Sequence, residues 1–96
     1  MNKQERKRFV ERIYSEIVNF DDDATFVQLD ERFFERIHLQ FIQKKPYTAV
    51  MASYSLGTTF VPDVAFAKVC YPDKWNARYG RELVVRKVLG SIAKQL

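Results

Sequence analysis

The chain is poor in the residue types that build most active sites. Its 96 residues include one cysteine, one histidine, three glycines and three prolines. Because His38 is the one histidine, no histidine-rich metal site can form, and coupling to Cys70 is the one histidine-assisted nucleophile pair available. Three glycines do not make a glycine-rich phosphate loop. We therefore expect no enzyme, no cofactor and no catalytic residue.

The chain also lacks features of secreted and membrane proteins. Cys70 has no partner for an internal disulfide bond, which favours a reducing compartment. The first eight residues are too polar for a secretory signal, and no apolar run reaches membrane-spanning length. Asp21, Asp22 and Asp23 are adjacent, whereas a calcium loop spaces its ligands and ends in a distant Glu, so we expect no metal there. These observations predict a cytoplasmic protein with no membrane partner.

Apolar residues are plentiful. Hydrophobic residues make up 47% of the chain and aromatic residues 15%, which predicts one folded domain over residues 1–96. The formal charge of +4 comes from 16 basic and 12 acidic residues. This balance permits an anionic partner without requiring one.

Hydrophobic periodicity predicts a helix at each end of the chain. Over residues 4–19, apolar side chains recur every three or four positions and define one face. A second apolar stripe runs from Val84 to Leu96. Asp73 is the expected N-cap of this helix, although Gly80 leaves open a start near Arg81.

The middle of the chain predicts strands. Residues 25–29 are rich in β-formers, Ile37, Leu39 and Phe41 alternate with polar side chains, and residues 47–54 and 64–71 continue the pattern. The fold class is therefore α+β, with an antiparallel sheet of three or four strands and both helices on one of its faces. The other face is then open to solvent or to a partner. Cys70 is expected to be a small packed side chain or a neutral surface thiol.

The closing stretch resembles a pattern of small bacteriophage and prophage proteins. It comprises Ala67-Lys68-Val69-Cys70-Tyr71-Pro72-Asp73-Lys74-Trp75, then Gly80-Arg81-Glu82-Leu83 and Arg86. Those proteins end in an alanine-rich strand, a Pro-x-Asp-x-aromatic turn and a Gly-x-x-hydrophobic-Ala-x-x-Arg helix. Here one residue is missing between Pro72 and Asp73, and Val84 or Val85 replaces the small helix residue. The resemblance covers about the last third of the chain.

Small phage proteins of this size include many inhibitors of host machinery, anti-CRISPR proteins among them. The resemblance therefore implies a non-catalytic inhibitor that binds a host or defence-system protein in the host cytoplasm. The alternative is a nucleic-acid-binding module, because helix, antiparallel sheet, helix is also the element order of double-stranded-RNA-binding domains. Both hypotheses remain open at the level of sequence.

The residues that we predict to contact a partner are basic and aromatic side chains near the C-terminus: Lys74, Trp75, Arg78, Tyr79, Arg81, Lys87 and Lys94. Trp75 and Tyr79 either fill the edge of the core or form an exposed aromatic site flanked by cations. Lys87 and Lys94 flank Gly90 on the polar side of the last helix. Gly90 has two interpretations. Either the helix ends or bends near Gly90 and its last turn is frayed, or the two lysines form a basic patch that a phosphate or an acidic protein surface can approach.

Overall fold

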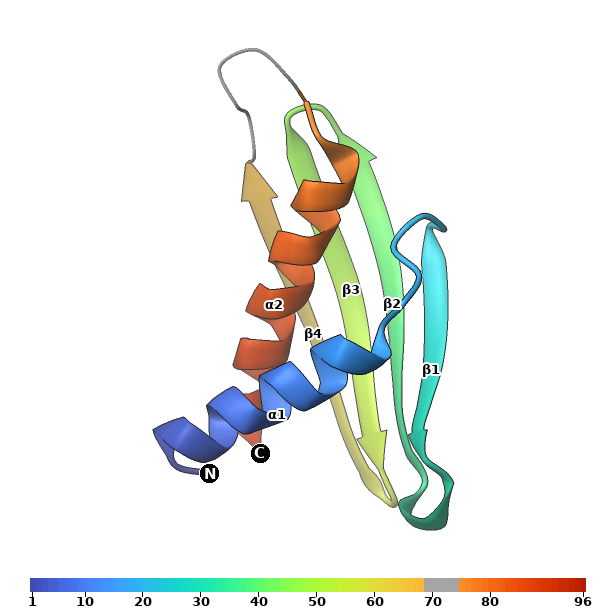
Figure 1. The fold of residues 1–96 in the computed structure, drawn as a ribbon, viewed down its shortest axis with the longest axis vertical. Coiled ribbons are helices and arrows are strands. Elements are labelled where there is room, and N and C mark those ends of the chain that lie inside the picture. Colours follow the sequence, from blue (N-terminus) through green and yellow to red (C-terminus); the bar gives the residue numbers. More distant parts are fainter. Residues whose placement is uncertain (69–74) are drawn as a thin grey trace.

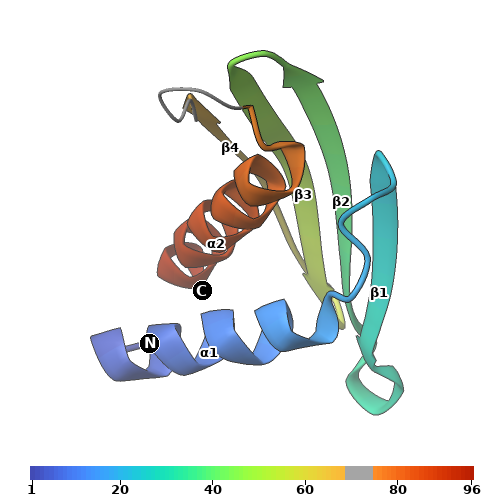
Figure 2. The same ribbon diagram turned by 45° about the horizontal axis from the view of Figure 1, so that its top comes forward.

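Two helices and a four-stranded sheet make up the described chain, residues 1–68 and 75–96 of this computed structural model. The elements are α1 (Lys3–Glu16), β1 (Ala24–Asp30), the 3₁₀ turn η1 (Glu31–Phe33), β2 (Glu35–Lys44), β3 (Tyr47–Leu56), β4 (Thr59–Lys68) and α2 (Ala77–Gln95). The strands form one antiparallel sheet in the order β1-β2-β3-β4 (Figure 1). Both helices lie on the same face of this sheet (Figure 2), which confirms the predicted fold class.

Helix α1 is shorter than its hydrophobic pattern predicted. It begins with a capping box, in which Asn2 accepts from the Glu5 amide and the Glu5 side chain accepts from the Asn2 amide. It ends at Glu16 rather than at residue 19. The Asn19 side chain accepts a hydrogen bond from the Asp21 amide at 2.9 Å and turns the chain there. Phe20 is nevertheless buried, because the turn folds back onto the sheet.

The strands alternate as the sequence predicted. On β2, Ile37, Leu39 and Phe41 are buried while Arg36 and His38 are exposed. Strand β4 begins at Thr59, five positions before the predicted start. Gly57 makes the earlier start possible, since its φ of 59° suits the tight turn between β3 and β4.

Strand β4 alternates between the two faces of the sheet where it is described. Ala67 is buried and Ala65 packs against the core on the helix side, while Phe66 points the other way. Pro62 is accommodated because β4 is an edge strand. The predicted continuation of the strand beyond Lys68, with Cys70, lies outside the described residues.

Helix α2 begins at Ala77, and the expectation of a start near Arg81 was wrong. Asn76 is the N-cap, and its side chain accepts from the Tyr79 amide at 2.9 Å. Asp73, the predicted cap, lies outside the described residues. Gly80 does not interrupt the helix. It lets the helix approach β3, because a Cβ atom at Gly80 would lie 2.5 Å from Thr48 Oγ1.

The core fills the space between the helices and the inner face of the sheet. Val84, Val85, Val88 and Ile92 of α2 are fully buried there, as the apolar stripe predicted. The helices are also joined to each other by an ion pair of Arg86 with Glu11, 2.9 Å between Nη1 and Oε1. Neither helix covers the opposite face of the sheet, which is the candidate site.

Candidate binding face

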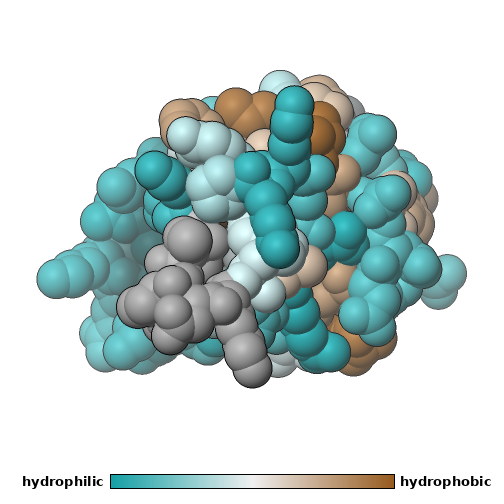
Figure 3. Space-filling model, turned by 90° about the horizontal axis from the view of Figure 1, so that it is seen from above, coloured by the Kyte–Doolittle hydropathy of each residue, from teal (hydrophilic) through white to brown (hydrophobic). Residues whose placement is uncertain are grey.

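The side chains that point away from the helices form what we call the outer face. It consists of the even-numbered residues of β2 and β4, the odd-numbered residues of β3, and the even-numbered residues of β1 as far as Gln28, as the alternating burial shows. A β-bulge after Gln28 turns Asp30 to the helix side, where it lies opposite Glu35. Figure 2 shows that neither helix lies on this side of the sheet. In the end-on view of Figure 3, hydrophobic side chains reach the surface along the upper edge.

The outer face is rich in large apolar side chains. They are between 44% and 72% exposed: Phe26, Ile42, Tyr47, Met51, Phe60, Val64 and Phe66. Since a large aromatic side chain carries roughly 150–250 Å² of surface, these fractions leave on the order of 800 Å² open to solvent. The largest apolar patch of a typical monomer is about 300–600 Å². Five of the side chains in this total lie in adjacent rows of the sheet and contribute on the order of 500 Å², near the upper end of that range: Ile42, Tyr47, Met51, Val64 and Phe66.

The strand registers make the apolar surface continuous. Ile42 lies opposite Ala49, which lies opposite Phe66, so one row of apolar side chains crosses three strands. In the next row, Met51 lies opposite Val64. Side chains in adjacent rows on one face of a sheet are near neighbours, and the two rows therefore form one patch.

Every charged side chain on the outer face, all of whose strand residues are described, is basic. Lys44 and Lys68 lie on either side of Tyr47 in the row next to the apolar patch. Arg36 lies toward the other end of the sheet, two positions from His38. The acidic strand residues Glu35 and Asp63 point to the helix side, where Glu35 is buried and Asp63 accepts from Gln95 Nε2 at 2.6 Å. The outer face thus combines exposed aromatic groups with positive charge.

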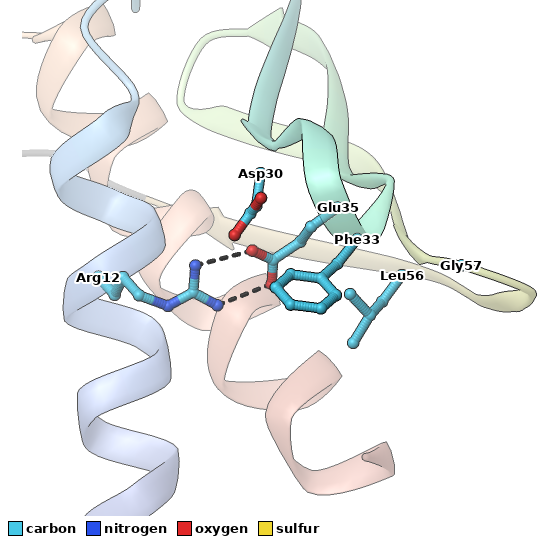
Figure 4. A pocket seen from close by; sticks show the side chains of 6 residues that line it. All are labelled: Arg12, Asp30, Phe33, Glu35, Leu56 and Gly57. Carbon is cyan, nitrogen blue, oxygen red and sulfur yellow. Dashed lines mark hydrogen bonds and ion pairs between the residues drawn. The ribbon is translucent and has the colours of Figure 1, made fainter.

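A hollow on the helix side of the sheet is a second candidate. It has a volume of about 620 Å³ and is lined by Arg12, Asp30, Phe33, Glu35, Leu56 and Gly57 (Figure 4). Arg12 donates to both carboxylate oxygens of Glu35, at 2.8 and 2.7 Å, and the buried Tyr54 hydroxyl donates to the same carboxylate. Asp30 accepts from Arg32 at 3.2 Å. The polar groups of the hollow are therefore occupied by one another.

Arg12 and Glu35 stabilise each other's charged forms in this hollow. Hydrogen bonds from Arg12, with a smaller effect from Tyr54, hold the pKa of the Glu35 carboxyl below its ordinary value, against the opposing effect of burial. Burial and the adjoining carboxylate raise the pKa of the Tyr54 hydroxyl above its usual range. A neutral Tyr and an ionised Glu are the forms that fit this network. Its role is to join α1 to β2, and we assign no chemistry to it.

Arg81, one of the predicted partner-binding residues, is buried. Its guanidinium donates to Gln43 Oε1 at 2.7 Å, to the carbonyl oxygens of Phe20 and Asp22 at 2.9 and 2.8 Å, and to Asp23 Oδ1 at 2.9 Å. Its guanidinium carbon also lies 4.9 Å from the centre of the Phe41 ring. Arg81 thus fixes the turn between α1 and β1 against α2, and all three of its guanidinium nitrogens donate to groups of the protein.

Three other predicted residues of this stretch lie at the start of α2: Trp75, Arg78 and Tyr79. Arg78 is exposed, forms an ion pair with Glu82 at 3.0 Å, and lies near the Phe20 ring. Tyr79 is 39% exposed and Trp75 is half-buried, so both readings of this aromatic pair remain predictions. Lys74 lies outside the described residues.

Lys87 and Lys94 are exposed on α2, and the helix continues unbroken past Gly90 to Gln95. The idea that the helix ends near Gly90 was therefore wrong, whereas a bend there stays a prediction. A Cβ atom at Gly90 would meet nothing within 4 Å. Lys87 Nζ donates to the Phe66 carbonyl at 3.3 Å, which directs it toward the exposed edge of β4. The two lysines share a helix with Arg81 but lie apart from the outer face.

The part of the chain that the structure describes holds no group of three or more His, Cys, Asp or Glu side chains placed to bind a metal ion. No helix within residues 1–68 and 75–96 is long and apolar enough to cross a membrane. Comparison with protein-family models, with curated proteins and with solved structures gives no match.

Sequence reasoning missed the outer-face residues individually, although it left one sheet face open. The sequence does contain a signal for them. In a half-buried strand, polar residues are expected at the positions that alternate with the buried ones, but three such positions are apolar: Ile42, Val64 and Phe66. Strands with apolar residues on both faces are typical of sheets that are covered on both sides. The two helices cover one side of this sheet, so the second set of apolar residues is exposed.

Proposed function

We propose that the protein is a non-catalytic binding protein that acts by laying its outer face against a macromolecular partner. The observation that carries the proposal is the set of large apolar side chains exposed on all four strands of the outer face. Their summed exposed area, roughly 800 Å², is similar to the area that one partner contributes to a standard-size interface. Binding of this kind needs a rigid scaffold with exposed aromatic and charged groups, and no reactive group.

The rest of the molecule forms a scaffold that holds the outer face in place. The helices close one face of the sheet, and the Arg12–Glu35 and Arg81 networks hold the helices and the α1–β1 turn in place. All four strands contribute to the outer face, so its side chains are held by the sheet ladder rather than by a mobile loop. The phage resemblance adds the hypothesis that such binding inhibits a host or defence component, because covering a surface is enough to inhibit it.

Site-specific photo-crosslinking tests this proposal. The photoreactive residue p-benzoylphenylalanine is placed at Phe66, 72% exposed on the outer face, and in a control protein at Val18, 87% exposed in the segment after α1. Both proteins are irradiated in lysate of the source cell. We expect adducts that form from position 66 and not from position 18.

The crosslinks are interpreted with one further pair of variants. Met51→Glu should remove adducts from position 66, because it places a negative charge within the apolar patch, whereas Lys94→Gln on α2 should leave them unchanged. Circular dichroism confirms that each variant is folded. Equal adduct patterns from positions 66 and 18, or no adduct at all, would contradict the proposal.

A further inference from the structure

The composition of the outer face allows its partner to be named by chemical class. This step rests on the proposed function, since it takes the outer face as the interface. We infer that the partner is a single-stranded nucleic acid, whose bases stack on the exposed aromatic rings and whose phosphates lie near the lysines and arginine at the two ends of the sheet.

Charge complementarity is the first argument. Arg36, Lys44 and Lys68 are the charged groups of the outer face, and no strand residue there, among those described, is acidic. A second copy of the chain would set basic groups against basic groups, and like charges across an interface oppose association. A polyanion gains from the same arrangement, because it releases counterions as its phosphates are neutralised.

Aromatic exposure is the second argument. Phe26, Phe60 and Phe66 are 57%, 61% and 72% exposed on the two edge strands, and Tyr47 lies between two lysines. Stacking of a base on an aromatic side chain contributes about 1–3 kcal/mol and tolerates any base, because every base has a π-face. Four-stranded sheets that carry aromatic side chains on an open face are a known way to hold unpaired bases.

The same features disfavour a duplex. The faces of paired bases are stacked within a duplex, so the phenyl rings of the outer face could not reach them, and binding would depend on phosphate contacts alone. The apolar row of Ile42, Ala49 and Phe66 would then lie against a charged backbone. Single strands expose both bases and phosphates and match both parts of the surface.

Fluorescence polarisation with defined probes tests the inference. The probes are fluorescein-labelled single strands of thymidylate and of uridylate, about 12 nucleotides long, within the site sizes that single folds cover. A duplex of the same length is the comparison. We expect the wild-type protein to bind a single strand at least about 10-fold more tightly than the duplex at low salt.

Two phenylalanines of equal exposure provide the matched variants. Phe26 on the outer face is 57% exposed, and Phe33, which lines the hollow on the helix side, is 58% exposed. Phe26→Ala and Phe66→Ala should each weaken single-strand binding by about 5- to 100-fold. Phe33→Ala should change it by less than about 2-fold, since its ring lies off the outer face. All three side chains are exposed, so we expect the variants to fold.

Four outcomes would overturn the inference. Weak single-strand binding that Phe26→Ala and Phe66→Ala do not alter, or equal binding of the duplex, would overturn the inference. Absence of binding together with protein adducts from position 66 in the crosslinking experiment would show a protein partner, so the inference would fail while the proposed function stood. Absence of both binding and adducts would overturn both.

Discussion

Arg12 of α1 and Glu35 of β2 form a two-pronged ion pair, with Nη1–Oε1 at 2.8 Å and Nη2–Oε2 at 2.7 Å. The arginine side chain is half exposed, whereas the carboxylate is 7% exposed and also accepts from the buried Tyr54 hydroxyl. The pair therefore connects helix α1 to strand β2 of the sheet. The pair contributes to stability mainly because the carboxylate is buried, where the hydrogen bonds from Arg12 and Tyr54 favour its ionised form.

This pair predicts loss of stability in acid. Because the pKa of Glu35 is lower in the folded chain than in the unfolded one, its contribution is present above the unfolded pKa of about 4.3 and is lost as pH falls through the folded pKa. Glu35→Gln should therefore reduce the free energy of unfolding at pH 7 by about 2 kcal/mol and flatten its decline in acid. Urea denaturation at a series of pH values measures both effects.

The control for this prediction is Glu16→Gln, at an exposed position near the end of α1. It should follow the wild-type profile at every pH. If Glu35→Gln and the wild type declined in parallel between neutral and acid pH, the ion pair would not be the source of acid sensitivity.

Arg81 predicts a large loss of stability on a substitution that keeps its charge. Lysine cannot reach the Gln43, Phe20, Asp22 and Asp23 acceptors together, because its ammonium group is a single point. Arg81→Lys should cost about 3 kcal/mol, as expected when a buried, hydrogen-bonded ion is disrupted. Arg78→Lys, one turn away and exposed, should cost less than about 1 kcal/mol. Equal denaturation midpoints for the two variants would contradict the assigned role.

The two glycines of α2 predict substitution effects of opposite sign. Gly90→Ala should stabilise the protein by about 1 kcal/mol, since alanine is the better helix former and its Cβ meets nothing within 4 Å. Gly80→Ala carries the same helical gain, but its Cβ would lie 2.5 Å from Thr48 Oγ1, which accepts from Gln43. We expect a net cost of about 1–2 kcal/mol at Gly80. Thermal unfolding of both variants measures the difference, and similar shifts would show that α2 and β3 are not in close contact.

The two basic surfaces of the molecule make competing predictions about salt dependence. If the outer face binds single strands, Lys44→Gln with Lys68→Gln should reduce the slope of log affinity against log salt by about 1.4, close to 0.7 per phosphate contact. Lys87→Glu with Lys94→Glu on α2 should leave that slope nearly unchanged and the fold intact. Loss of binding in the α2 double variant alone would place the interface on the last helix, as the sequence first suggested.

The sequence by itself determined the elements and the layers of this protein. Period-two alternation on β2 and the apolar stripe from Val84 to Ala93 depend on local geometry, so they can be recognised without knowing what they pack against. The α+β class and the placement of both helices on one face followed from them. The ends of the elements differed from the prediction. Helix α1 ends at Glu16, before the turn that Asn19 makes, and α2 begins at Ala77, because the Asn76 side chain caps it at the Tyr79 amide.

Tertiary structure alone decided which residues form surfaces and which are internal. Arg81 is a typical exposed cation by sequence, but it is buried because four acceptors from β2 and the α1–β1 turn converge on it. Phe26 and Phe66 are typical core residues by sequence, but they are exposed because both helices cover the opposite face. Side-chain type sets the cost of burial, whereas strand order and helix placement decide where burial is possible. For this reason the candidate interface emerged from the fold and not from a motif.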